Sequence, residues 1–280
     1  MSAPLPADRN QPLGPFKAGL DWVYRSVMLF RKNPPKWLMH ALLYVILFVM
    51  MPSIPAMPVL VSLVIILFWP TFLALFMGIY READLGRDTE PRVLVEEIRP
   101  NFIRLITLGG MCLAYGILAG VLVKTDTASL ADLVNQKAEA EVLMAQAVPL
   151  ILKMLLLLAP MIMASWFSPM LIAFQGYPVL EAIKHSIWQC GKNMIAITVA
   201  WAILTIALLV LMLVAGIVMS IITAMSAFVG GILMGLVVFG MLLVMTYFLL
   251  AIQYFSYRHV YYHPEAASAD ESDESGNSFF

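Results

Sequence analysis

Long apolar stretches without a charged side chain dominate the chain. Four of them contain no Asp, Glu, Lys or Arg, and they cover residues 37–80, 105–123, 154–180 and 193–257. A helix that crosses a bilayer needs about 20 apolar residues, so the first and last stretches are long enough for two helices each. The alternating pattern of a transmembrane β-barrel is absent. The pattern therefore predicts an all-α integral membrane protein with six transmembrane helices.

Turn-forming residues divide the longer stretches into hairpins. Pro52, Pro55 and Pro58 break the first pair of spans, and small or polar residues between Ser220 and Gly231 break the third. The middle pair is joined by the segment 124–146, whose charged residues and alanines predict a short exposed helix. The six spans are thus predicted at residues 35–54, 58–80, 102–123, 148–174, 194–221 and 228–256.

An amphipathic helix is predicted before the first span, over residues 16–32. Its apolar residues recur at helical spacing, at positions 20, 23, 27 and 30, while charged residues fall mostly elsewhere. Such a helix lies in the membrane interface and does not cross the bilayer. The membrane domain then covers residues 16–263, with a disordered segment 1–15 before it and a disordered acidic tail 264–280 after it.

The amphipathic pattern occurs again later in the chain. The segment 20–33 aligns without a gap to the segment 180–193, and Ser26 then pairs with Ser186. A fainter third copy covers residues 91–101, where Leu94 stands in place of the serine. The fold is therefore predicted as three repeats of an interfacial amphipathic helix plus a transmembrane hairpin. The alternative is that any amphipathic helix that enters a hairpin looks similar.

Composition and charge exclude several classes of function. The chain is 61% hydrophobic and 12% charged with a mean hydropathy of +0.87, whereas a soluble domain is about half apolar and about a quarter charged. A net charge of −1 argues against nucleic acid as a partner. Charged residues deep in the spans, which would indicate an ion pathway, are lacking, since His40 and Lys153 lie near span ends.

Motifs for catalysis or cofactor binding are also lacking. There is no glycine-rich phosphate loop, no zinc-protease motif, and no serine with a suitable His and carboxylate. His259 and His263 are four residues apart, but the tyrosines around them favour an interfacial aromatic cluster over a metal site. Cys112 and Cys190 are interpreted as packing residues. We therefore expect no enzyme activity, no cofactor and no metal.

Three asparagines stand where an amphipathic helix gives way to a span. An asparagine at the N-cap accepts a hydrogen bond from an amide of the first helical turn, which lipid cannot satisfy. At the first of these positions a proline follows, and proline suits the first helical position. We predict helix caps at Asn33, Asn101 and Asn193. The alternative is that asparagine merely tolerates the bend.

Prolines and glycines inside the spans predict bends and close helix contacts. Proline removes a backbone donor and bends a helix, and glycines four residues apart let two helix backbones approach closely. We predict kinks at Pro70, Pro160 and Pro169 and helix packing at Gly116, Gly120, Gly231 and Gly235. The kinks either outline a cavity or only shape the bundle.

One group of residues resembles a known family. The run from Trp166 to Pro169, followed by Ala182, Ser186, Cys190 and Asn193 before a span, resembles an uncharacterised family of proteobacterial six-span inner-membrane proteins. That family is distantly similar to the membrane domain of glycerophosphodiester phosphodiesterases, although this chain has no soluble phosphodiesterase domain. The resemblance implies an inner-membrane location and a six-span architecture, and no activity.

The sequence leaves three functions open: a scaffold, a carrier or channel, and, as a distant third, a membrane-bound lipid enzyme. The favoured hypothesis is a non-enzymatic accessory or scaffold protein of the inner membrane, which contacts membrane lipid, another membrane protein or a second copy of itself. The competing hypothesis is a carrier or channel for an uncharged or lipidic solute. A polar cavity between the three predicted kinks would favour transport.

The distribution of Lys and Arg predicts the orientation in the membrane. Of the 17 such residues, all but Lys124, Lys137 and Lys153 lie on one side of the predicted spans. Positive residues mark the cytoplasmic side, so both termini are predicted to be cytoplasmic. Reporter fusions at the C-terminus and near Arg87 should read as cytoplasmic, and one near Ala138 as external. An external C-terminus would contradict the predicted span number.

Overall fold

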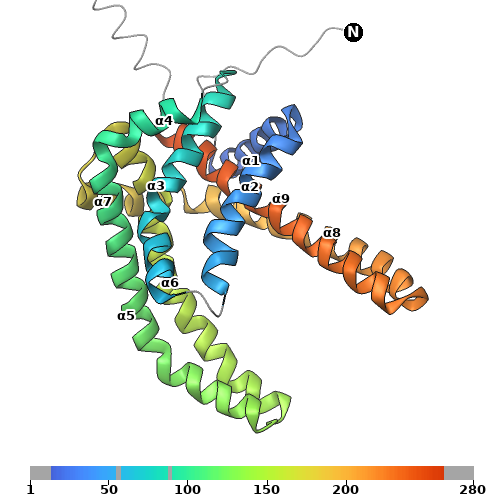
Figure 1. The fold of residues 1–280 in the computed structure, drawn as a ribbon. Coiled ribbons are helices and arrows are strands. Elements are labelled where there is room, and N and C mark those ends of the chain that lie inside the picture. The colour runs from blue at the N-terminus through green and yellow to red at the C-terminus, as the bar shows by residue number, and fades with distance from the viewer. Residues whose placement is uncertain (1–13, 55–57, 88–89, 262–280) are drawn as a thin grey trace, which may run out of the picture. The chain divides into compact units, whose positions relative to one another are not determined.

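The computed structural model describes residues 14–54, 58–87 and 90–261, and its regular structure is entirely helical over these residues (Figure 1). Six helical segments are long and apolar enough to cross a membrane, as the sequence predicts: Pro34–Ser53, Val59–Asp84, Pro91–Asn135, Ala140–Gln175, Met194–Met225 and Ala227–Tyr261. The predicted disordered segments 1–15 and 264–280 lie largely or wholly outside the described residues.

Three shorter helices lie where amphipathic helices are predicted, namely α1 (Pro15–Lys32), α4 (Pro91–Ile98) and α7 (Val179–Lys192). The long helices are α3 (Val59–Asp84), α5 (Phe102–Asn135), α6 (Ala140–Gln175), α8 (Met194–Met225) and α9 (Ala227–Tyr261). The first span is less regular: α2 (Pro34–Val45) continues as a π-helical turn, η1 (Ile46–Met50), and a 3-10 turn, η2 (Met51–Ser53).

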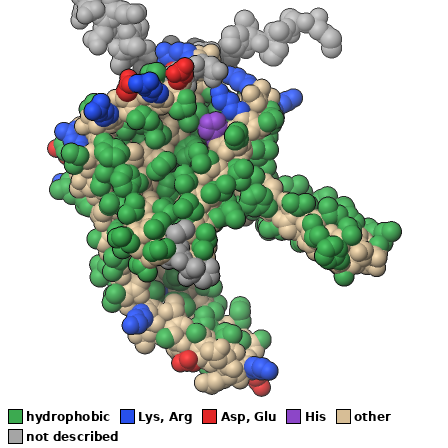
Figure 2. All heavy atoms as spheres, viewed as in Figure 1, with side chains coloured by type: hydrophobic (Ala, Val, Ile, Leu, Met, Phe, Trp, Pro, Cys, Tyr) green, Lys and Arg blue, Asp and Glu red, His purple; other side chains and the backbone are tan. Residues whose placement is uncertain are grey.

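The chain forms two compact units. The first unit contains α1, the start of α2, α8 and α9 as far as Ser256. The second contains the segment Met39–Gly191 and the described residues from Tyr257 onward. In the second unit, charged side chains gather around α4 and at the tip of the α5–α6 hairpin, with an apolar surface between them (Figure 2). That separation suits two aqueous sides and one hydrocarbon layer.

Two side-chain donors hold the first unit together across its helices. The hydroxyl of Tyr247 on α9 donates to the backbone carbonyl of Ser26 on α1, at 2.8 Å, and the indole Nε1 of Trp37 donates to the carbonyl of Leu29, at 2.9 Å. The rings of Phe30 and Trp37 pack on Tyr247, with centroid distances of 4.9 and 5.6 Å. The same contacts satisfy polar groups and bury aromatic area, which fixes α1 on α9.

In the second unit α3, α5 and α6 pack side by side. A Cβ atom built on Gly109 of α5 would lie only 2.0 Å from the carbonyl oxygen of Leu67 on α3. The hydroxyl of Tyr115 on α5 donates to the carbonyl of Leu157 on α6, at 2.7 Å. A missing side chain thus permits the α3–α5 contact, and a tyrosine joins α5 to α6.

The segment between the middle spans is largely helical and exposed, as predicted, but it does not form a separate short helix. Residues 124–135 continue α5, residues 140–146 belong to α6, and a short turn between them holds Lys137 at a φ of 54°. At 1.5 Å per residue, the 34 residues of α5 reach about 51 Å, well beyond a hydrocarbon core of about 30 Å. Alanine and charged residues favour a helix as well as apolar residues do, so α5 continues beyond the residue at which the apolar span ends.

The four glycines predicted to pack helices do not do so within their unit. A Cβ atom at Gly116, Gly120, Gly231 or Gly235 would meet nothing within 4 Å. Close packing occurs instead at Gly109, at Gly19, where a Cβ would lie 2.5 Å from the carbonyl oxygen of Ala196, and at Gly230, beside Thr223. Glycine spacing identifies a smooth helix face, but it does not tell whether another helix or lipid covers that face.

The predicted caps have different outcomes. The side-chain oxygen of Asn33 accepts a hydrogen bond from the Lys36 amide, at 3.2 Å, which is the contact that the predicted cap requires, and its stabilising role stays a prediction. Asn101 and Asn193 occupy N-cap positions without a side-chain cap hydrogen bond, so capping is wrong there. The Asn101 amide instead donates to the carbonyl of Ala173 at the end of α6, 3.4 Å away.

Replacing Gly109 should be far more damaging than replacing Gly116. In Gly109→Ala the new methyl group overlaps the Leu67 carbonyl, so α3 and α5 must separate; overpacking of this kind costs about 1–3 kcal/mol. Gly116→Ala, the matched control on the same helix, should change stability by less than about 0.5 kcal/mol. Thermal melts in detergent measure both. Equal melting temperatures would contradict the α3–α5 contact.

The Asn33 cap gives a second stability prediction. Asn33→Ala removes the acceptor of the Lys36 amide and should lower the free energy of unfolding by about 1 kcal/mol. Asn33→Asp and Asn33→Ser keep an acceptor and should be nearly silent. Asn193→Ala, without a cap hydrogen bond to lose, serves as the comparison in the same detergent melts. If alanine, serine and aspartate at position 33 cost the same, the capping explanation fails.

Candidate functional site

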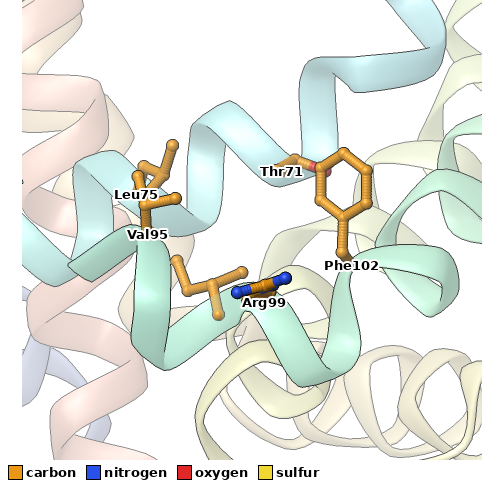
Figure 3. A pocket seen from close by; sticks show the side chains of 6 residues that line it. Thr71, Leu75, Val95, Arg99 and Phe102 are labelled. Atoms are coloured by element: carbon orange, nitrogen blue, oxygen red, sulfur yellow. The ribbon is translucent and has the colours of Figure 1, made fainter. Parts of the chain in front are cut away.

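A groove lies in the second unit between the span α3 and the amphipathic helix α4. It has a volume of about 320 Å³ and is lined by Thr71, Leu75, Val95, Ile98, Arg99 and Phe102 (Figure 3). Thr71 and Leu75 form the α3 wall, and the other residues come from α4, the 3-10 turn η3 (Arg99–Asn101) and the start of α5. The groove therefore opens where an interfacial helix meets a span.

Two prolines place the residues of the groove. Pro91 stands in the first turn of α4, where its missing amide costs no helical hydrogen bond. Pro100 lies in η3 and breaks the ladder between α4 and α5, so the chain turns between Ile98 and Phe102. Arg99 sits at this bend, at the rim of the groove (Figure 3).

An arginine clamp fixes α4 against α3 and α6. Both terminal nitrogens of Arg81 donate to the carboxylate of Glu97, at 2.8 and 2.6 Å, which is the strong bidentate geometry. The guanidinium of Arg81 also lies over the ring of Phe174, 4.7 Å from its centroid. Leu94 packs into the space beside Gly78 of α3, where a Cβ would lie 3.3 Å away. The width of the groove is thus set by contacts outside it.

The polar side chains that line the groove lack hydrogen-bond or ion-pair partners among the described residues, unlike several arginines around it. Thr71 is only 7% exposed, and its hydroxyl has no hydrogen-bond partner among the described residues. Leaving such a hydroxyl unsatisfied costs about 1–3 kcal/mol. Arg99 is exposed and forms no ion pair with any described residue, whereas Arg81, Arg87 and Arg92 each pair with a glutamate. The groove is an apolar channel with an uncompensated positive charge at its rim.

Several of the residues that carry the family resemblance meet at a second place, where α7 packs on α6; Asn193 belongs to the other unit. The Ser186 hydroxyl donates to the carbonyl of Met163, at 2.6 Å, and accepts from the amide of Phe167, at 3.0 Å. Those two groups would normally bond to each other within α6, so the serine is inserted into the helix ladder. Ala182 and Cys190 are buried on the same face of α7. The motif therefore has a structural role in docking α7.

Cys190 has the properties of a packing residue, as predicted. It is a free cysteine, and its thiol lies 3.6 Å from the Met163 carbonyl. Burial raises the pKa of the Cys190 thiol to about 12, so the reactive thiolate is scarce at neutral pH. The residue fills the α6–α7 contact and offers no nucleophile.

One of the three prolines predicted to bend helices, Pro70, marks where packing begins in its helix. Pro70 lies inside α3, and Pro160 and Pro169 lie inside α6. In α3 every buried residue lies at or after Pro70, while most of the earlier half is more exposed. The bends themselves stay a prediction. None of the three prolines lines the groove, although Thr71 directly follows Pro70.

The sequence contained weak signals for the groove that were not recognised. Arg99 follows the apolar positions Val95 and Ile98 of the third amphipathic copy, and Thr71 is an isolated hydroxyl in an apolar run. Their proximity depends on how α4 folds back onto α3. His263, the partner of His259 in the alternative metal site, lies outside the described residues, and no His, Cys, Asp and Glu cluster within these residues suits a metal.

Comparison with known proteins bears on the location of the chain. No protein-family model matches the chain, and no solved structure matches it. It is 27% identical over 203 residues to a Burkholderia thailandensis protein named "Probable inner membrane protein", covering 65% of this chain and 70% of that protein. Together with six helices of spanning length, this supports the predicted inner-membrane location. Within the described residues the chain has six apolar helices suited to cross a membrane, and the protein to which it is similar is named a probable inner membrane protein.

Proposed function

We propose that the protein is a non-enzymatic accessory or scaffold protein of the inner membrane. Its three interfacial helices hold a polar layer at the cytoplasmic surface and contact lipid or a membrane partner there. In this proposal the interfacial helix and the following hairpin form a unit that is used three times. The spans anchor the units, and the interfacial helices carry the contacts.

The observation that carries this proposal is that the interfacial helices have two different faces. On α7, the small residues Ala182 and Ser186 pack on the protein, while Leu180 and Trp188 are 62% and 63% exposed. On α1, Trp22 is fully buried, whereas other aromatic residues of the helix, Phe16 and Tyr24, are about 60% exposed. An interfacial helix with exposed aromatic and basic residues suits the boundary of headgroups and acyl chains.

The acidic groups near these helices support a structural role. One carboxylate oxygen of Glu82 lies 3.1 Å from Nε of Arg81, and the other lies 3.0 Å from Nε of Arg87. The carboxylate of Asp84 pairs with the guanidinium of Arg258. These ion pairs join the ends of α3 and α9 within the second unit and so strengthen the surface layer.

The carrier or channel hypothesis has less support. It calls for a polar cavity near Pro70, Pro160 and Pro169, whereas the groove described above is apolar and none of these prolines lines it. An apolar groove between an amphipathic helix and a span fits a lipid contact better than a polar path across the bilayer.

Site-specific photo-crosslinking in cells that produce the protein tests the proposal. A photo-reactive phenylalanine analogue at position 188, on the exposed face of α7, should give adducts with phospholipid or with one membrane protein. The same analogue at position 166 is the matched control, because Trp166 is 7% exposed and should give only intramolecular products.

Two results would contradict the proposal. One is the absence of any adduct at position 188 beyond those at position 166. The other is protein-dependent accumulation of an uncharged solute in proteoliposomes, which would favour the carrier hypothesis.

A further inference from the structure

We propose that the groove between α3 and α4 is a specific site for one anionic phospholipid of the adjoining leaflet. An acyl chain occupies the apolar channel, the phosphodiester binds the guanidinium of Arg99, and the Thr71 hydroxyl donates to an ester carbonyl. This inference deepens the proposed function, because it rests on the lipid contact of the interfacial helices and assigns it to named residues.

The lining of the groove matches one part of a phospholipid. Leu75, Val95, Ile98 and Phe102 supply an apolar surface at the level where an interfacial helix meets a span. The volume of about 320 Å³ is at the lower end of small-molecule pockets, which run from about 300 to 1,000 Å³. It therefore suits a segment of a single acyl chain better than a complete two-chain lipid.

Charge selects the headgroup. Arg99 is at the rim, exposed, and without an ion-pair partner among the described residues. Guanidinium groups bind phosphate oxygens through strong charge-assisted hydrogen bonds. A headgroup with a net negative charge therefore satisfies Arg99 better than a zwitterionic one, whose own cation competes for the phosphate.

The buried hydroxyl of Thr71 supplies a second, independent indication of a ligand. The residue is more than nine-tenths buried, lines the groove, and lacks a hydrogen-bond partner within the part of the chain that is described. Hydrocarbon cannot accept its proton, but the ester carbonyl that joins an acyl chain to glycerol can. In a phospholipid this carbonyl joins the glycerol that carries the phosphate to the chain.

Neighbouring contacts keep the site open. The clamp of Arg81 on Glu97 and the packing of Leu94 beside Gly78 set the separation of α4 and α3 without entering the groove. The site is therefore preformed, and binding does not have to order a helix first.

Native mass spectrometry of the full-length, delipidated protein in detergent tests the site. Dioleoyl phosphatidylglycerol should bind saturably with one tight equivalent, and more tightly than dioleoyl phosphatidylcholine. Arg99→Gln should weaken the first binding event roughly tenfold or more, and Thr71→Val severalfold. Val95→Trp, which fills the channel, should weaken it for either headgroup.

Matched controls separate the groove from general effects. Arg92→Gln removes a cation from α4 outside the groove, and Thr107→Val removes a hydroxyl that already bonds to the Ile103 carbonyl. Both should bind as the unaltered protein does. Arg99→Lys keeps the positive charge and should retain most of the affinity. If Arg99→Gln does not fold, Thr71→Val and Val95→Trp carry the test.

Several outcomes would overturn the site. Equal weakening by Arg99→Gln and Arg92→Gln would show that only general charge attracts the lipid, and full displacement by inorganic phosphate would show a free-anion site. A second copy of the chain covering the groove, seen as a lipid-insensitive dimer, would also overturn it. In these cases lipid contact elsewhere on the interfacial helices still stands, whereas failure of any phospholipid to bind would count against the proposed lipid contact as well.

Discussion

The structure depends on satisfying backbone N–H and C=O groups where lipid offers no hydrogen bond. Helices satisfy most of them internally, which explains why the described residues form no other regular structure. The contacts between helices then use the carbonyls, each of which has a second lone pair. Tyr247, Trp37, Tyr115 and Ser186 all donate from one helical element to a carbonyl of another. These bonds fix helix positions without charges in the hydrocarbon.

The same constraint explains the form of the interfacial layer. Each interfacial helix must cover polar groups at a span end and still leave a surface that suits the membrane boundary. Ser26, Leu94 and Ser186, which share one position in the proposed repeat, are all buried. The contacts of these three residues differ, however. The Tyr247 hydroxyl donates to the backbone carbonyl of Ser26, the Leu94 side chain packs beside Gly78, and the Ser186 hydroxyl accepts from a backbone amide of α6. The three amphipathic helices are therefore attached in three different ways.

The groove is the place where this hydrogen bonding of polar groups is incomplete. The clamp at Arg81 uses its donors fully, while Arg99 and Thr71, a short distance along the same elements, keep unused donors. In a membrane, the molecule that supplies acceptors at this depth is the lipid itself. A protein that fits lipid into its interfacial layer gains a defined position relative to the leaflet, which suits a scaffold.

Local chemistry in the sequence determined the number and place of the spans, the existence of the amphipathic helices, and the cap at Asn33. Apolar length decides where a chain enters the bilayer, and the Asn33 cap joins residues only three apart. The tertiary structure alone decided that Gly109 packs and Gly116 does not, that Asn101 bonds to α6, and that Arg99 and Thr71 share a groove. These features depend on which helix faces meet, and a membrane-spanning helix that is apolar all round gives almost no periodic signal of its contact face.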